Sequence, residues 1–423
     1  MKLSIRNFAK ILKADIEIDG ITIIAGNNNI GKSTIGKTLD AVFNATYNID
    51  EKMNNARIDS LSHMLRNEIE QNRYKHDLRF RHYTMRTYSE FAKVLLECES
   101  AEREEICRKY EERMIPQSDD ESDFVEKVIG YLEENKKISD EVFSRTIYTN
   151  YFDESFHGEI NSLYDKEGLA EIVLSIKEKD IRLIFKKDEC IEEKHQFEIL
   201  NNSIYIDDPF VIDEMNHILT FGISELSLHK RNILRKLIQK EDKEVEEKAF
   251  SDLLVANKLE DIIKIINRVA AGKVVKKQKY MYQFADDSSK ELDVASLSTG
   301  VKAFLILKQL LLNGNLSDKD VIVLDEPEIH LHPEWQLLYA ETIVDFHIVV
   351  TTHSAHFMEA LELYSKKYEI SERCNYYLAD MQENGAVFEN VTKNISKIYK
   401  QMVDPTLLLS RLRGELETED DEL

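Results

Sequence analysis

The chain has 423 residues, 43% of them hydrophobic, so it can bury one large core or several smaller ones. Lysine and arginine total 56 against 79 aspartate and glutamate residues, and the formal charge of −23 argues against indiscriminate binding to nucleic acid, which needs many basic side chains. The sequence shows neither the apolar core of a secretion signal at its start nor an apolar run of roughly 18 residues, so we expect a cytoplasmic protein without a membrane span. The four cysteines lie far apart, which predicts free thiols.

The first predicted elements are strands. Alternating apolar residues at 3–5 and 16–18 are typical of half-buried strands, and the apolar run at 21–25 leads into the segment GNNNIGKST at 26–34. Glycines and a Lys-Ser pair at this spacing predict a phosphate-binding loop, in which backbone N–H groups at a helix start surround an anion. We expect the lysine of this loop, Lys32, to reach the β- and γ-phosphates, and the serine, Ser33, to bind Mg²⁺ through its hydroxyl. The predicted nucleotide-binding residues are Gly26, Asn27, Asn28, Asn29, Ile30, Gly31, Lys32, Ser33 and Thr34, with Ser33 also a metal ligand.

A long insertion follows this loop. Residues 50–150 are rich in Glu, Lys, Arg and Leu and poor in Gly and Pro, which predicts a helical insertion. The runs 171–176 and 181–185 predict an antiparallel hairpin, and 203–207 predicts a short strand.

A second helical segment is predicted next, with Gly272 as its C-terminal stop and a strand at 274–284 after it. We therefore divide the chain into an N-terminal part of the core (1–49), a helical insertion (50–168), a β segment of the core (169–211), a helical subdomain (212–272), a C-terminal part of the core (273–400) and a C-terminal helix with an acidic tail (401–423).

Three further motifs lie in the C-terminal part. SLSTG at 296–300 precedes a strongly apolar helix, whereas VIVLDEP at 321–327 and VVTTHS at 349–354 place polar residues at the end of apolar, β-branched runs. Such runs are typical of strands in a parallel sheet covered on both faces, whose sites lie at the carboxyl ends of the strands. The predicted fold class is α/β, a doubly wound sheet with an antiparallel β subdomain and large helical insertions.

These motifs supply the candidate reactive groups. Asp325 and Glu326 end a buried strand, where two carboxylates are costly unless they serve a cation or a reaction. We expect Asp325 to hold Mg²⁺, usually through water, and Glu326 to polarise the water that attacks the γ-phosphate of ATP. His353 would orient that water. The alternatives are a helix-capping role for the acidic pair and simple packing for the histidine. At the positive end of the apolar helix, the residues expected to contact nucleotide are Ser298, Thr299 and Gly300.

The order of P-loop, LSTG, LDEP and THS resembles the ABC ATPase superfamily. The blocks at 5–8, 19–34 and 324–336 resemble its OLD-type and RecF-like members, which are related to SMC proteins. This resemblance covers about residues 1–45 and 290–360. It implies an ATPase that uses ATP and Mg²⁺ in a homodimer or a higher even-numbered oligomer, where the LSGG-type block of one subunit closes on ATP held by another. Thr299 departs from the glycine that is common at its position.

Many OLD-type proteins continue into a Toprim nuclease, and its Asp-x-Asp pair is absent after His353. The chain therefore resembles the stand-alone ATPase subunits of bacterial antiphage systems such as Septu, PARIS and retron-associated modules. That resemblance implies a dimeric switch controlling a separately encoded effector, a nuclease. The glutamine that ABC-type ATPases place near Mg²⁺ has no assigned counterpart here; the segment 203–209 runs toward that region and contains none.

Two alternatives remain open. A RecF- or SMC-like ATPase would itself bind DNA, and the basic run 73–86 is its candidate contact; a solvated helix face is the competing interpretation of that run. A transporter motor is disfavoured by the long insertion and by HLHP at 330–333, which we interpret as part of a dimer-contacting loop rather than a zinc site.

Overall fold

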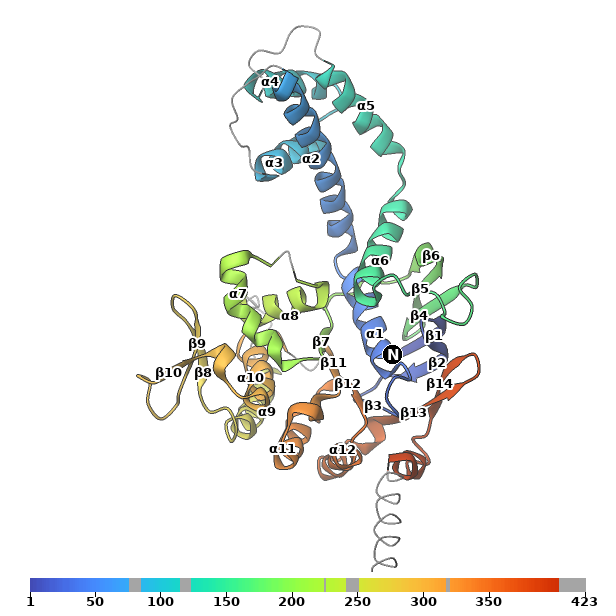
Figure 1. Ribbon diagram of the computed structural model, residues 1–423, viewed down its shortest axis with the longest axis vertical. Coiled ribbons are helices and arrows are strands. Elements are labelled where there is room, and N and C mark those ends of the chain that lie inside the picture. The colour runs from blue at the N-terminus through green and yellow to red at the C-terminus, as the bar shows by residue number, and fades with distance from the viewer. Residues whose placement is uncertain (76–84, 115–122, 224–225, 241–250, 317–319, 403–423) are drawn as a thin grey trace, which may run out of the picture. The chain divides into compact units, whose positions relative to one another are not determined.

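The computed structural model describes residues 1–75, 85–114, 123–223, 226–240, 251–316 and 320–402 (Figure 1). The chain forms two compact units: unit 1 comprises Met1–Tyr47 and Thr149–Leu423, and unit 2 comprises Asn48–Tyr148. Most of the basic run at 73–86, and the acidic tail, lie outside the described residues.

Unit 1 is built on one 11-stranded sheet with the order β6-β5-β4-β1-β2-β14-β13-β3-β12-β11-β7. Its antiparallel part consists of β1 (Lys2–Phe8), β2 (Ile11–Glu17), β4 (Ala170–Ile176), β5 (Lys179–Lys186) and β6 (Glu189–His195). Its parallel part consists of β3 (Ile21–Ala25), β7 (Ile204–Ile206), β11 (Val321–Asp325), β12 (His347–Thr352) and β13 (Cys374–Gln382), and β14 (Gly385–Asn390) connects the two. The α/β fold class, with an antiparallel part, is confirmed.

The parallel strands bring distant motifs to one edge of the sheet. Every residue of β3 is buried, as its unbroken apolar run predicts. In the register of the sheet Asp325 lies beside Thr351, and Thr352 lies beside Ala25. The carboxyl ends of β3, β11 and β12 are therefore neighbours, although they are far apart in the sequence.

Helices complete the core of unit 1. The helix α1 (Lys32–Thr46) packs on β7, β11 and β12. The apolar helix after the LSTG motif is α10 (Thr299–Leu312), and α11 (Pro333–Ile343) and α12 (Ala355–Lys367) pack against each other. The short 3-10 helices are η1 (Pro209–Asp213), η3 (Val294–Ser296), η4 (Pro327–His330) and η5 (Ser371–Arg373).

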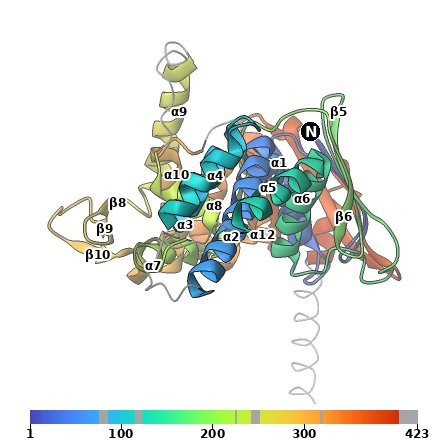
Figure 2. The ribbon, with the colours of Figure 1, turned by 90° about the horizontal axis from the view of Figure 1, so that it is seen from above.

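The remaining part of unit 1 corrects two predictions. It contains α7 (Glu214–Phe221), α8 (Leu228–Ile238), α9 (Ser251–Ile266) and a three-stranded sheet of β8 (Lys273–Lys276), β9 (Tyr280–Gln283) and β10 (Glu291–Asp293). The predicted single strand at 274–284 is thus a hairpin. Gly272 does not end a helix, because α9 stops at Ile266; a Cβ at Gly272 would lie 2.3 Å from the Gln283 carbonyl, so this glycine permits a close backbone approach. In Figure 2 the small sheet lies at the opposite side of unit 1 from β5 and β6.

Unit 2 is helical, as its composition predicts. Its helices are α2 (Ile49–Lys75), α3 (Met85–Glu97), α4 (Arg103–Met114) and α5 (Phe124–Lys137), and α6 (Asp140–Phe156) continues beyond the unit. All of α2–α5 contribute to one apolar core, which includes Leu61, Leu65, Phe91, Leu95, Cys107, Phe124 and Leu132. The six-segment division of the chain stays a prediction.

Candidate active site

The loop between β3 and α1 is shaped to hold an anion. Gly31 adopts φ 94° and ψ 22° at the N-cap of α1, a left-handed conformation that favours glycine, and no side chain caps the first N–H groups of the helix. Residues 27–29 are exposed. A cavity of about 250 Å³ opens at this loop, and its lining comprises Ala9, Lys10, Asn29, Gly31, Lys32, Ser33, Thr34, Phe156, Glu159, Leu163 and Glu326.

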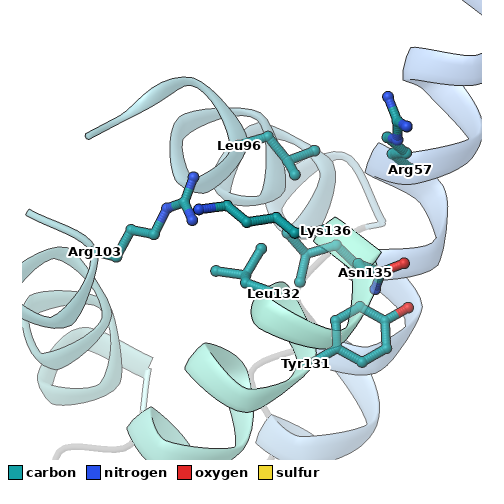
Figure 3. Close-up of a pocket in the computed structure, with 8 residues that line it drawn as sticks. Arg57, Leu96, Arg103, Tyr131, Leu132, Asn135 and Lys136 are labelled. Atoms are coloured by element: carbon teal, nitrogen blue, oxygen red, sulfur yellow. The ribbon is translucent and has the colours of Figure 1, made fainter. Parts of the chain in front are cut away.

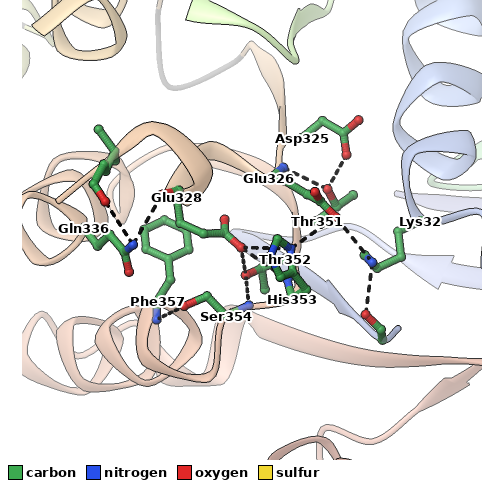
Figure 4. A network of polar contacts seen from close by, with 12 residues as sticks. Lys32, Asp325, Glu326, Glu328, Gln336, Thr351, Thr352, His353, Ser354 and Phe357 are labelled. Atoms are coloured by element: carbon green, nitrogen blue, oxygen red, sulfur yellow. Dashed lines mark hydrogen bonds and ion pairs between the residues drawn. The ribbon is translucent and has the colours of Figure 1, made fainter. Parts of the chain in front are cut away.

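Lys32 is held inside the loop. Its side chain is only 4% exposed, and its Nζ donates hydrogen bonds to the carbonyls of Gly26 at 3.0 Å and Asn27 at 2.9 Å. The same Nζ lies 3.4 Å from Glu326 Oε1 (Figure 4). A nearly buried ammonium satisfied mostly by carbonyl oxygens is well placed to take up an anion, because charged acceptors form stronger bonds with it.

Asp325 receives hydrogen bonds on both carboxylate oxygens. Ser33 Oγ, on α1, donates to Oδ1 at 3.0 Å, and Thr351 Oγ1 donates to the same oxygen. Tyr205, on the neighbouring strand β7, donates its phenol to Oδ2 at 2.7 Å. Burial, together with the Asp325 charge, raises the pKa of Tyr205 well above its ordinary value, so the phenol stays a donor.

The donor set suits Mg²⁺. This ion prefers oxygen ligands and commonly takes only one or two from the protein, with water and phosphates completing its shell. The Asp325 carboxylate and the Ser33 hydroxyl, 3.0 Å apart at the mouth of the P-loop, are such a pair. The residues present therefore fit a magnesium ion.

Glu326 lies between two basic side chains. Its Oε1 is 3.4 Å from Lys32 Nζ and 3.4 Å from His353 Nδ1, and its backbone has φ 49°. A non-glycine residue in this left-handed region costs about 1 kcal/mol or more. Hydrogen bonds from the Glu326 N–H to the carbonyl and the hydroxyl of Thr351, both 3.1 Å, hold it there. The turn aims the carboxylate back over the P-loop.

Residues 1–358 match the protein family described as an AAA ATPase domain. The chain belongs to this family. No curated protein sequence is significantly similar to the chain. Among the described residues, no helix has the length and apolar character that crossing a bilayer requires.

Several solved SMC heads resemble this AAA ATPase domain weakly. The SMC head domain from Thermotoga maritima is 12% identical, with 92% of this chain and 98% of that chain covered and a TM-score of 0.38. An Smc head with an extended coiled coil, bound to the C-terminal domain of ScpA and derived from Pyrococcus furiosus, is 13% identical, with coverages of 95% and 98% and a TM-score of 0.40. An Smc head bound to the C-winged helix domain of ScpA is 12% identical, with coverages of 94% and 98% and a TM-score of 0.41.

Sequence reasoning missed Glu328, whose carboxylate supports the end of β12 and His353. Its side chain is 3% exposed, and its Oε1 accepts hydrogen bonds from Thr352 Oγ1 at 2.5 Å and from the His353 N–H at 3.2 Å (Figure 4). The other oxygen, Oε2, is buried and has no hydrogen-bond partner in the described part of the chain. Burial raises the pKa of this carboxyl. The only signal in the sequence was a second glutamate two positions after the first.

Tyr205 was missed for a different reason. It was predicted as part of a short strand, and nothing in the sequence pairs it with Asp325, which lies 120 positions away. The parallel register of β7 and β11 creates the contact: Tyr205 lies opposite Val323, two residues before Asp325 and on the same face.

The LSTG motif at 297–300 lies apart from this cavity. Ser298 is the exposed N-cap of α10 and makes no capping hydrogen bond. Gly300 approaches α11 so closely that a Cβ would lie 2.7 Å from the Trp335 ring, and Lys302, 2% exposed, lies 2.8 Å from the Asp213 carboxylate. None of residues 298–300, all of which the structure describes, lines the P-loop cavity of the same chain. The motif is therefore held in place by contacts of Gly300 and Lys302, and Ser298 is exposed.

Proposed function

We propose that the chain is an ABC-type ATPase that binds and hydrolyses ATP with Mg²⁺ and acts as a dimeric molecular switch. One observation carries this proposal. Lys32 and Ser33 of the P-loop, Asp325 at the end of β11, Glu326 directly after it and His353 after β12 converge at one edge of the sheet, with the contacts among them at 3.0–3.4 Å. Such a group combines an anion cradle, an oxygen pair for a metal and a candidate base.

The residues divide the chemistry among them. The N–H groups at the start of α1 and the Lys32 ammonium bind the phosphates, while Asp325 and Ser33 would hold the metal. Mg²⁺, when bound, would neutralise charge on the β- and γ-phosphates. Glu326 accepts a proton from the attacking water, and His353 Nδ1, 3.4 Å from Glu326 Oε1, fixes the orientation of that carboxylate.

The position of the LSTG motif supports dimerisation. Ser298 and the free N–H groups of α10 form an anion-binding helix end that the chain's own P-loop cavity does not use. A second copy, facing the first, would bring this helix end to the phosphates, which supports a homodimer or a higher even-numbered oligomer. The dimer would form on ATP and separate after hydrolysis.

The output of the switch is the finer part of the proposal. We infer control of a separately encoded effector, a nuclease, in a cytoplasmic antiphage system, and the motif resemblance at 19–34 and 324–336 supports it. A RecF- or SMC-like role in which the chain itself binds DNA is equally compatible with the site. These two functions differ in one measurement, because only the second requires salt-dependent DNA binding by the isolated protein.

Substitution of Glu326 tests the chemistry. Glu326→Gln removes the base but keeps the size of the side chain, so we expect ATP hydrolysis to slow by roughly 100-fold or more while ATP binding persists. Turnover is measured by phosphate release, and binding with a fluorescent ATP analogue. Wild-type turnover in this variant would remove Glu326 from the mechanism.

Complementation tests the dimer. Lys32→Ala inactivates the P-loop and Ser298→Ala inactivates the LSTG motif, so each variant alone should be inactive. A mixture of the two contains mixed dimers, in which the intact P-loop of Ser298→Ala faces the intact LSTG motif of Lys32→Ala. ATP hydrolysis should therefore return in part. Failure of every mixture to regain activity, with both variants folded, would contradict a site shared between two copies.

A further inference from the structure

Unit 2 contains a cavity that the ATPase site does not use. Its volume is about 290 Å³, at the small end of ligand pockets, and all four helices α2–α5 contribute to it (Figure 3). The floor is apolar, and the rim carries three basic side chains. The lining residues are Arg57, Leu61, Leu96, Arg103, Tyr131, Leu132, Asn135 and Lys136.

One of the three cations is neutralised within the protein. Arg57 forms an ion pair with Asp140 and lies over the Phe143 ring, 4.7 Å from its centroid. The Arg57 guanidinium is therefore already paired with a carboxylate and stacked on an aromatic ring. Arg57 lines the cavity but needs no anionic ligand to balance its charge.

Arg103 is different. Its side chain is 9% exposed, its Nε is buried without a hydrogen-bond partner, and its Nη2 makes one long contact of 3.5 Å to the Cys98 carbonyl. Within the described ranges it forms no ion pair. A guanidinium withdrawn from water with so little compensation is costly, and such groups are normally paired with an anion.

Lys136 adds a second uncompensated charge. In Figure 3 its side chain and that of Arg103 extend toward one another beside Leu132. Lys136 Nζ donates to Ser100 Oγ at 3.2 Å, and it pairs with no carboxylate in the part of the chain that the structure describes. Two like charges directed at one space repel each other, and an anion between them would relieve this repulsion.

We propose that this cavity of unit 2 binds a small phosphate monoester with an apolar body. A phosphate monoester carries about −1.5 to −2 charges near pH 7, which matches two uncompensated cations better than a carboxylate does. Arginine and lysine from two helices would hold the phosphate, and Leu61 and Leu132, both almost fully buried, provide the apolar floor. The proposal concerns unit 2 alone and does not depend on the ATPase mechanism.

Calorimetry with phenyl phosphate tests it on the full chain. All variants carry Lys32→Ala, so that the P-loop contributes little to the signal. Arg103→Met and Lys136→Met should each weaken binding by about tenfold or more, since each removes a charge-assisted bond. Lys127→Met is the matched control, because Lys127 is also on α5 but pairs with Glu68 and Asp123 and does not line the cavity; its affinity should stay within about twofold of the parent.

Two further measurements sharpen the result. Benzoate, with the same ring and one charge, should bind more weakly than phenyl phosphate, and equal affinity would overturn the choice of a phosphate. Without ligand, Arg103→Met should unfold at the same temperature as the parent or higher, because it removes an uncompensated charge. Destabilisation of Arg103→Met alone, an unchanged affinity in that variant, or no binding of phenyl phosphate at millimolar concentration by the parent would overturn the proposal. Lys136 is exposed, so Lys136→Met should keep the fold, and an unchanged affinity in that variant would also overturn the proposal.

Discussion

Removal of the Tyr205 hydroxyl should lower the affinity of the site for Mg²⁺ without lowering its affinity for the nucleotide. Tyr205 donates to Asp325 Oδ2 at 2.7 Å; the tyrosine is buried and the aspartate is half-buried. Hydrogen bonds to charged groups contribute about 1.5–3 kcal/mol, and loss of a group that orients a metal ligand typically costs 10–100-fold in metal affinity. In Tyr205→Phe we therefore expect the Mg²⁺ concentration for half-maximal ATP hydrolysis to rise about tenfold. Binding of a fluorescent ATP analogue in EDTA should be unchanged, because Asp325 does not contact nucleotide in this scheme.

The control separates orientation of Asp325 from general stability. Tyr377→Phe removes a phenol in the same sheet, which accepts a hydrogen bond from the Glu17 N–H at 2.7 Å and one from Asn390 at 3.2 Å, away from the P-loop. Both variants should lose a similar, small free energy of unfolding, but only Tyr205→Phe should change the Mg²⁺ dependence. An identical Mg²⁺ titration for wild type and Tyr205→Phe would refute the role assigned to the phenol.

Two further predictions concern buried carboxyls. Glu328→Gln keeps an oxygen acceptor for Thr352 and for the His353 N–H, so the rate of ATP hydrolysis should fall less than about tenfold. Glu328→Ala leaves both donors unpaired and should lower the free energy of unfolding by about 1–3 kcal/mol. Equal stability of the two variants in denaturant titrations would contradict this support role. Asp40 is buried, and burial raises its pKa from 3.8 to about 6. The unfolded chain therefore loses this proton at lower pH, and the carboxyl reduces the free energy of unfolding progressively as the pH rises from about 4 to about 6. Asp40→Asn should still accept from Ser203 and Asn44, and its stability relative to wild type should rise by up to about 3 kcal/mol from pH 4 to pH 7; a stability difference independent of pH would show that Asp40 is ionised at little cost.

Local patterns allowed much of the fold to be predicted. The apolar runs at 21–25 and 321–324 are buried parallel strands, and the hairpin at 171–185 is present, because strand burial is written in consecutive residues. The P-loop and the acidic pair were placed by contiguous motifs, and the structure brings them within hydrogen-bonding distance through Ser33 and Asp325. Their catalytic roles stay predictions.

Other features depend on distant contacts that no local pattern encodes. Gly272 has the sequence neighbourhood of a helix end, but its backbone packs against β9. The antiparallel strands β4–β6 continue the same sheet as the P-loop strand, because β4 (from Ala170) pairs with β1 (to Phe8), although the helical unit 2 lies between them in the sequence. Arg103 was unremarkable among the many charged residues of its helix until packing buried it without a counter-ion.

The sequence by itself determined the candidate groups for binding a nucleotide, since a P-loop and a strand-end acidic pair are formed by adjacent residues. The tertiary structure decided what supports those groups: the phenol on Asp325, the buried Glu328 behind His353, and the separation of Ser298 from the cavity of its own chain. The physical reason is that hydrogen-bond partners and burial arise from strand order and register, which join residues far apart in the chain.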